Sequence, residues 1–287
     1  MTIPSVITRE NAAGFLDSRV DPALWTALIP AAGRGSRLGF HHPKILFPVA
    51  GATILEWLVD LLQPLCERFV FVLSPSAAAP VEAAASRLLP GRFAIAPQPE
   101  PRGMADAIRC GLPQVKTRHT LIVWGDQVAL WPDSLQFLMR LHQGIAQPAA
   151  VCPTLWRDHP YIHFERDASG RLDRILQARE GDQMPERGES DSGVFLFRTE
   201  TLGQHLPRLL ASAECIGRHT RELNFLPIFP MLDKLITAPI MSEAESVGVN
   251  SPADAAYLEQ HLQARDAPRS PAGRRLTEPR PQGSEPA

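Results

Sequence analysis

The hydrophobic pattern in the first half of the chain alternates between short apolar runs and longer amphipathic segments. The short runs have the length of strands buried on both faces, and they cover residues 27–29, 69–73, 93–96, 120–124 and 149–152. The segments between them carry apolar residues at helical spacing, over residues 53–62, 77–89, 104–112 and 134–142. Strands that alternate with helices are typical of a doubly wound sheet. We therefore predict a Rossmann-like, three-layer α/β/α fold with a mixed, mostly parallel sheet.

The pattern changes after residue 160. Two short runs flank a polar turn as in a hairpin, and they cover residues 161–164 and 172–176. Further elements are predicted as strands at 193–197 and 247–249, a helix at 201–210, a mixed helical stretch at 225–235 and a closing helix at 252–264. We expect an N-terminal extension over 1–24, one domain over 25–264, and a disordered tail over 265–287, which is rich in Pro, Arg, Ser and Glu.

Composition and charge exclude several classes of protein. The formal net charge of −2 gives no reason to expect nucleic acid or an anionic membrane as a partner. The four cysteines form no C-x-x-C pair, which argues against a zinc site and a disulfide scaffold; they are Cys66, Cys110, Cys152 and Cys215. The N-terminus lacks the pattern of a signal peptide, and no apolar run is long enough to cross a bilayer. We expect a soluble, cytoplasmic protein.

A glycine-containing loop follows the first predicted strand. It reads AAGRGSRL over residues 31–38, and Pro43-Lys44 follows. The run fits neither the spacing of a Walker A loop nor that of a Rossmann fingerprint. A small, flexible turn after a strand still brings backbone N–H groups and nearby cations close to a phosphate. The loops after residues 29, 96 and 124 all lie at the carboxyl edge of the predicted sheet, where ligands bind in such folds.

The loop and its Pro-Lys pair resemble the opening motif of the sugar-phosphate nucleotidyltransferases. The chain is similar over about residues 28–262 to the pyrophosphorylase domain of bacterial UDP-N-acetylglucosamine pyrophosphorylases, and more distantly to glucose-1-phosphate thymidylyltransferases. The resemblance implies that Arg37 and Lys44 contact phosphates and are catalytic. It also implies that the loop backbone wraps the nucleotide, through Ala31, Ala32, Gly33, Gly35 and Ser36. The alternative is a surface loop whose cations are only solvated.

A second family motif implies the site for the base. Gln98 stands five residues before Gly103, the spacing of the glutamine and glycine that recognise a pyrimidine in the family. An amide can donate and accept at once, which suits uracil or thymine. Met104 departs from the family, which usually has threonine or another small residue there. The alternative is a polar loop with a glycine that starts a helix.

The resemblance further implies a Mg²⁺ site. Asp126 follows the strand at 120–124 as the aspartate of the family's Gly-Asp pair does, and it is also implied to be catalytic. Asn250, in Gly-Val-Asn, stands where the uridylyltransferases supply the second metal oxygen. A carboxylate, an amide oxygen, phosphate oxygens and water suit Mg²⁺. The alternatives are a helix cap for Asp126 and a turn residue for Asn250.

The acceptor region matches the family less closely. Tyr161 and Gln177 occupy positions near those of acceptor-binding residues, but Gln177 replaces a glutamate, for which Glu180 could substitute. Asp191 replaces an asparagine in the motif before the strand at 193–197. These changes alter the hydrogen bonds that are offered to sugar hydroxyl or N-acetyl groups. The alternative for these residues is a turn that leads into the strand.

Taken with the resemblance, these residues predict an NTP and a sugar phosphate, or another small phosphorylated acceptor, as partners. The expected reaction moves a nucleoside monophosphate from an NTP, UTP or dTTP, to a sugar 1-phosphate with release of pyrophosphate. The alternatives are a CTP-dependent enzyme acting on a non-sugar phosphate such as choline phosphate, and a non-catalytic nucleotide-sugar sensor. The sequence leaves an oligomer open.

Overall fold

A computed structural model describes residues 6–8, 11–16, 19–33, 35–145, 148–238 and 242–266 of the chain. The α-helices are α1 (Ile54–Leu62), α2 (Pro75–Leu88), α3 (Met104–Gly111), α4 (Pro132–Gly144), α5 (Thr199–Leu210) and α6 (Pro252–Asp266). The 3₁₀ turns are Ala13–Phe15, Pro22–Leu24, Ser36–Leu38, Lys44–Leu46, Leu112–Gln114, Ala178–Glu180, Ala213–Cys215, Leu226–Met231 and Ala244–Ser246. Of the segment 265–287 that we predicted as a disordered tail, residues 265 and 266 belong to α6, and the rest lies outside the described residues.

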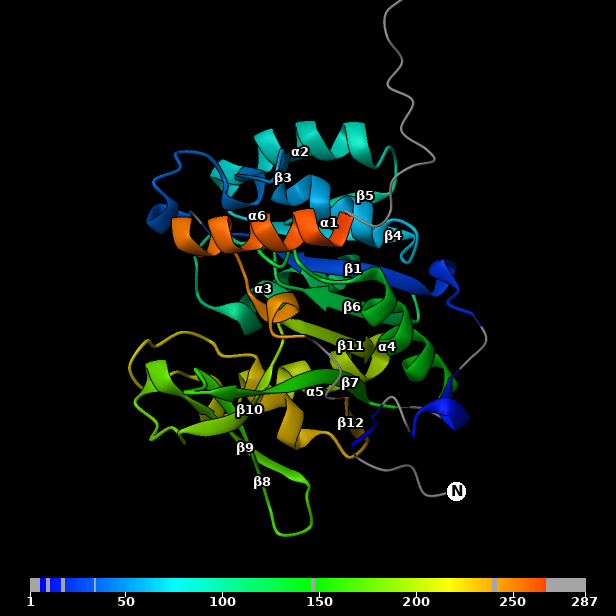
Figure 1. Ribbon diagram of the computed structural model, residues 1–287, viewed down its shortest axis with the longest axis vertical. Helices are drawn as coiled ribbons and strands as arrows, with labels where there is room; N and C mark the ends of the chain where they lie inside the picture. The colour runs from blue at the N-terminus through cyan, green and yellow to red at the C-terminus, as the bar shows by residue number, and fades with distance from the viewer. Residues whose placement is uncertain are drawn as a thin grey trace, which may run out of the picture.

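An open, mixed sheet forms the centre of the molecule (Figure 1). Its strands are β1 (Trp25–Pro30), β4 (Arg68–Leu73), β5 (Phe93–Pro97), β6 (His119–Val123), β7 (Ala150–Asp158), β10 (Arg187–Asp191), β11 (Val194–Arg198) and β12 (Leu235–Ala238). The strand order is β10-β7-β11-β6-β1-β4-β5, and β12 pairs with β7. Strands β6, β1, β4 and β5 are parallel, whereas β11 runs antiparallel between β6 and β7. Two short hairpins complete the strands, β2 (Pro48–Val49) with β3 (Ala52–Thr53) and β8 (Ile162–Arg166) with β9 (Leu172–Gln177).

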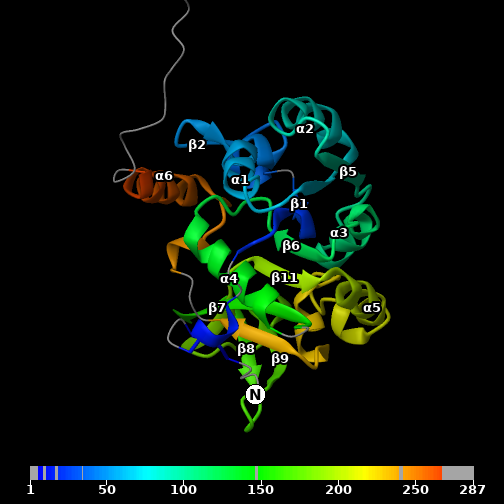
Figure 2. The ribbon, with the colours of Figure 1, turned by 90° about the vertical axis from the view of Figure 1, so that its right-hand side faces the viewer.

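Helices cover both faces of the sheet and bury two hydrophobic cores. Because successive side chains of a strand point to opposite faces, Ala27 and Ile29 of β1 face one core and Leu28 faces the other. Helices α1, α2, α4 and α6 supply buried residues to the first core, and α3 and α5 to the second. Figure 2 shows α1, α4 and α6 on one side of the sheet and α3 and α5 on the other. The structure thus confirms the predicted three-layer α/β/α fold.

Several segments differ from the sequence prediction, among them strand β7, which runs to Asp158 although the apolar run predicted it only over 149–152. Residues 247–249 do not form a strand, although the N–H of Val249 donates to the carbonyl of Asp126 at 3.0 Å. The helical stretch predicted over 225–235 is a 3₁₀ turn that ends at Met231, because Pro227 and Pro230 lack the N–H that an α-helix needs, and strand β12, which was not predicted, begins at Leu235. Strand β10 was not predicted, because its polar sequence RGESD lacks an apolar alternation.

The N-terminal residues pack onto the sheet. Ile7 and Ala12 are fully buried in the first core, and the N–H of Ile7 donates to the carbonyl of Thr237 in β12 at 2.8 Å. The predicted boundary at residue 25 stays a prediction, but part of the extension shares the core of the domain. Within the described residues, the helices are too short or too polar for any of them to cross a membrane.

The antiparallel strand β11 determines which loops meet at the carboxyl edge of the sheet. Val194 pairs with Val123 at the end of β6, and the N–H of Trp124 donates to the carbonyl of Gly193 at 3.1 Å. The segment before β11 therefore lies beside the segment after β6. In consequence, residues 190–193 reach the same edge as the loops after β1 and β5.

Candidate functional site

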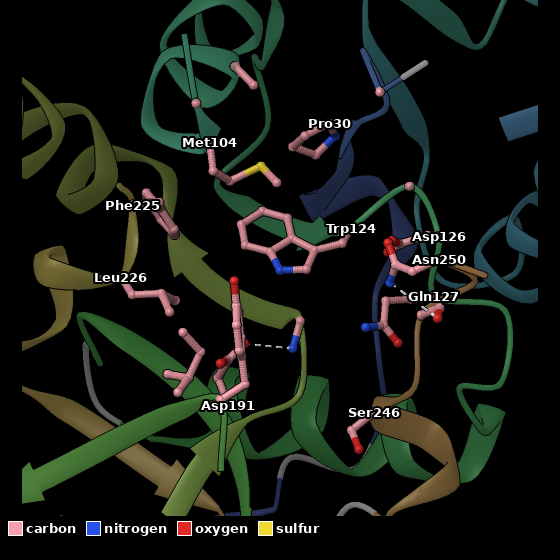
Figure 3. A pocket seen from close by; sticks show the side chains of 18 of the residues that line it. Pro30, Met104, Trp124, Asp126, Gln127, Asp191, Phe225, Leu226, Ser246 and Asn250 are labelled. Atoms are coloured by element: carbon pink, nitrogen blue, oxygen red, sulfur yellow. Dashed lines mark hydrogen bonds between the residues drawn. The ribbon is translucent and has the colours of Figure 1, made fainter. Parts of the chain in front are cut away.

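A cavity of about 660 Å³ opens at the carboxyl edge of the sheet. Its walls come from the loops after β1, β5 and β6, from residues of β7 to β10, and from the segments 222–226 and 243–250. The indole of Trp124 lies near its centre, between Asp126 and Asn250 on one side and Phe225 and Leu226 on the other (Figure 3).

The loop after β1 is held by close backbone contacts. The N–H of Ala31 donates to the carbonyl of Val72 at 2.8 Å, and the N–H of Gly125 donates to that of Pro30 at 3.0 Å. A Cβ at Gly125 would lie 2.8 Å from both Ala31 Cβ and Pro30 O, so only glycine allows this approach. Ala31, Ala32 and Gly33 line the cavity as predicted positions for a nucleotide.

Two other residues of this loop lie farther back. Gly35 has a φ of +65°, and a Cβ there would lie 3.2 Å from Lys44 Cβ, so it supports Lys44 and does not line the cavity. The side chain of Ser36 lies outside what the structure describes, and its backbone begins the turn Ser36–Leu38. These two predicted contacts with a nucleotide stay predictions.

Lys44 joins the predicted catalytic and metal residues. Its Nζ donates to Asp126 Oδ2 at 2.6 Å and to Asn250 Oδ1 at 2.9 Å. Arg37 Nη2 also donates to Asn250 Oδ1, at 3.3 Å, although the Arg37 side chain is exposed and does not line the cavity. The fold thus brings together four residues that are up to 213 positions apart in the sequence.

The surroundings of Asp126 and Asn250 fit a hard divalent cation. The ammonium of Lys44 bridges one oxygen of each residue, so a positive charge already occupies the space between them. A Cβ at Gly248 would come within 2.8 Å of Asp126 Cγ, so the carboxylate depends on a glycine there. The described residues contain no group of three or more His, Cys, Asp or Glu that could hold a metal. Phosphate and water oxygens would have to complete the coordination of Mg²⁺.

The predicted base site is a tight corner beside α3. Gln98 is buried at the end of β5, and its Nε2 donates to Gly103 O at 3.2 Å. Gly103 has a φ of +112°, and a Cβ there would lie 2.6 Å from the backbone nitrogen of Leu223. Both facts require glycine at position 103. Gln98, Gly103 and Met104 all line the cavity, with Met104 above the indole of Trp124 in Figure 3.

Three of the four predicted acceptor residues line the other wall. Tyr161 is exposed at the start of β8, Gln177 is buried at the end of β9, and Asp191 ends β10. Asp191 Oδ2 accepts from the N–H of Gly193 at 2.9 Å, and no described cation forms an ion pair with it. Burial raises the pKa of the Asp191 carboxyl, although the hydrogen bond from Gly193 opposes this rise.

Glu180 is placed differently from the expectation. Its carboxylate does not line the cavity but accepts from the hydroxyl of Thr220 at 2.6 Å and from the N–H of His219 at 2.9 Å. Burial alone would raise the pKa of Glu180, but these hydrogen bonds outweigh it and lower the pKa to about 2. Glu180 therefore stabilises segment 217–224 behind the acceptor wall, and the structure gives no support to direct contact with an acceptor.

Sequence reasoning missed Gln127. This residue is 4% exposed, lines the cavity, and lies against Gly193, where a Cβ would come 2.6 Å from Gln127 Nε2. Its Oε1 is buried without a hydrogen-bond partner among the described residues. A buried amide oxygen without a partner is costly, and it marks a place for a ligand donor. The available signal was its position directly after Asp126, in a loop that the topology places at the site.

Comparison with protein-family models matches residues 27–191 to the MobA-like NTP transferase domain. The matched range runs from β1 to the end of β10 and covers more than half of the chain. It contains the loop after β1, the corner formed by Gln98 and Gly103, and Asp126.

Similar curated proteins extend the match beyond β10. The bifunctional protein GlmU of Gloeobacter violaceus is 28% identical over 228 residues, covering 78% of this chain and 48% of that protein. The proteins of the same name from Sorangium cellulosum and Carboxydothermus hydrogenoformans are 30% and 27% identical, covering 86% and 84% of this chain and 54% and 53% of the relatives. The chain thus spans about half the length of the curated relatives that it matches.

Proposed function

The chain belongs to the MobA-like NTP transferase domain family, and from this premise we propose that it is a sugar-1-phosphate nucleotidyltransferase. The proposed reaction joins the nucleoside monophosphate of UTP or dTTP to a sugar 1-phosphate and releases pyrophosphate. The resemblance to the pyrophosphorylase domain of GlmU-type proteins supports this choice. The proposed site of action is the cavity at the carboxyl edge of the sheet.

One observation carries the proposal: Lys44 Nζ bridges Asp126 Oδ2 and Asn250 Oδ1. A nucleotidyl transfer needs positive charge beside the triphosphate and oxygen ligands for a divalent cation, with little acid–base chemistry. The arrangement supplies both. When it is bound, Mg²⁺ would neutralise phosphate charge, and Asp126 and Asn250 would hold it.

The chain's own residues would orient the two substrates for direct displacement. An oxygen of the sugar phosphate attacks the α-phosphorus, a new P–O bond forms, and the bond to the β-phosphate oxygen breaks. Lys44 and Arg37 would stabilise the negative charge of the departing pyrophosphate. The acceptor phosphate is already an anionic nucleophile, so no side chain has to remove a proton.

The acceptor wall favours a ligand with several hydroxyl groups. Asp191, Gln177 and Gln127 offer carboxylate and amide groups to the cavity, and Trp124 offers an aromatic face at its centre. The two amides can each donate and accept, which suits sugar hydroxyls and supports a sugar 1-phosphate. The indole beside the Asp191 carboxylate would also suit a quaternary ammonium, so choline phosphate belongs among the acceptors to be tested.

Pyrophosphate release tests the proposal. The purified chain is assayed with Mg²⁺ and each of UTP, dTTP, CTP, GTP and ATP against a panel of sugar 1-phosphates, choline phosphate and other non-sugar phosphates. We expect turnover with UTP or dTTP and at least one sugar 1-phosphate. Activity confined to CTP and a non-sugar phosphate would establish the alternative enzyme. Tight nucleotide-sugar binding without pyrophosphate release would instead indicate a sensor.

A further inference from the structure

Asp106 is a buried carboxylate in the first turn of α3 that the sequence did not single out. Its side chain is 3% exposed. Asp106 Oδ2 accepts from Gln98 Nε2 at 2.9 Å, and Oδ1 accepts from Nη2 and Nε of Arg109 at 2.7 and 3.1 Å. Both carboxylate oxygens therefore accept hydrogen bonds, and the partner of Oδ2 is Gln98, a residue of the predicted base site.

These contacts fix the orientation of the Gln98 amide. Nε2 has two hydrogens, and its two partners are the carboxylate of Asp106 and the carbonyl of Gly103. Neither partner can donate a hydrogen bond. A rotated amide would place Oε1 against both acceptors and lose two hydrogen bonds in a buried place, which is costly. The nitrogen of Gln98 therefore stays on the protein side.

Only the oxygen of Gln98 is then left for a ligand. Gln98 lines the cavity, and in the described part of the chain no hydrogen bond reaches its Oε1. The N–H of Gly103 next to it likewise has no partner there, because the φ of +112° turns this residue out of the helix. The corner thus presents one acceptor and one donor side by side.

We propose that Asp106 is a positioning residue that makes the site select uracil or thymine over cytosine. This inference rests on the proposed nucleotidyltransferase function, because it assigns the base that the same cavity accepts. N3 of uracil and thymine carries a hydrogen that can donate to Gln98 Oε1, while an adjacent carbonyl accepts from Gly103 N–H. In the same pose, N3 of cytosine presents a lone pair to Oε1, so two acceptors meet. Cytosine would need the rotated amide that Asp106 prevents.

The variant Asp106→Asn tests this role. An asparagine has nearly the same shape, but its amide can donate to Gln98 Oε1 and so allow Gln98 to rotate. Asp133→Asn, the same change in the first turn of α4 at an exposed position outside the cavity lining, is the matched control. Binding of UTP, dTTP and CTP is measured by calorimetry without an acceptor phosphate, so the readout does not depend on turnover. Relative kcat/KM values for UTP and CTP supply a second readout.

We expect the wild-type chain and Asp133→Asn to bind UTP or dTTP roughly 10- to 100-fold more tightly than CTP, and Asp106→Asn to lose at least about tenfold of that preference. A merely structural role would weaken all nucleotides alike. An unchanged preference in a folded Asp106→Asn chain would overturn the inference. So would wild-type binding of CTP as tight as that of UTP, a comparison that needs no variant. If no acceptor yields pyrophosphate while the binding preference behaves as expected, the proposed reaction fails and the base selection stands.

Discussion

Replacing Asp126 by asparagine separates the catalytic role of this carboxylate from its structural one. The Lys44–Asp126 pair is 2.6 Å long, and the two side chains are 16% and 19% exposed. At an effective dielectric constant of about 20, the bare attraction at that distance is roughly 6 kcal/mol, most of which desolvation and solvent screening offset. An asparagine keeps an oxygen for Lys44, and Asn250 remains its second partner. The free energy of unfolding should therefore fall by only about 1–2 kcal/mol.

The effect on turnover should be larger. Loss of one group that stabilises charge in a transition state costs at least about 10²-fold in kcat, or roughly 2.7 kcal/mol. The assay is pyrophosphate release at saturating NTP and acceptor over a Mg²⁺ titration, with Tm measured in parallel. Asp60→Asn, the same change at an exposed position of α1, is the control. Near-normal kcat for Asp126→Asn at saturating Mg²⁺ would refute the assignment of Asp126 to the reaction.

Three further variants test the site from other sides. Gly248→Ala places a Cβ 2.8 Å from Asp126 Cγ, so the carboxylate has to shift. We expect kcat to fall roughly 10- to 100-fold with little change in Tm. An unaltered kcat would show that the position of the carboxylate is not critical. Gln127→Leu removes a buried oxygen without a hydrogen-bond partner, so Tm should stay the same or rise. The KM for the acceptor should increase about tenfold, and the KM for the NTP should not change. Equal changes in both KM values would contradict a contact with the acceptor. The pKa of Glu180 is lowered to about 2 from 4.5, so its contribution of roughly 3 kcal/mol is present above pH 4.5 and is lost as pH falls toward 2. The unfolding free energies of wild type and Glu180→Gln should therefore differ at pH 6 and converge near pH 2, and a constant difference would contradict this account.

The sequence predicted the part of the fold that rests on apolar periodicity. Strands β1, β4, β5, β6 and β11 and the six α-helices of the described residues were expected within a few residues, because each has apolar positions at strand or helical spacing. Topology predicted that the loops carrying Lys44 and Asp126 meet at one edge of the sheet, whereas Asn250 was expected beside Asp126 only from the family resemblance. The structure adds their distances.

The remaining differences have physical causes that a pattern of residues does not contain. Strand β10 is polar although its central residues are buried, because Glu189 is paired with Arg166 and Thr154, and no alternation of apolar residues marks such a strand. Glu180 and Asp106 are carboxylates whose partners lie 40 and 8 residues away, and only the fold shows that one faces away from the cavity and the other supports Gln98. Gln127 became a candidate because its oxygen is buried without a partner, a property of packing.

The pairing of β11 with β6 has a consequence for how the two substrates are aligned. The loop that carries Asp126 begins at Trp124, the segment that carries Asp191 ends at Gly193, and one backbone hydrogen bond of 3.1 Å joins these two residues. The pairing of β11 with β6 fixes the distance between these two segments, because the spacing of paired strands is set by main-chain geometry and not by side chains. A shift of the strand register by one residue would exchange the faces of Val194 and Phe195, which belong to opposite cores. The two cores therefore hold β11 in this register. Acceptor preference can therefore change through side chains on the wall while the distance between attacking oxygen and phosphorus is preserved.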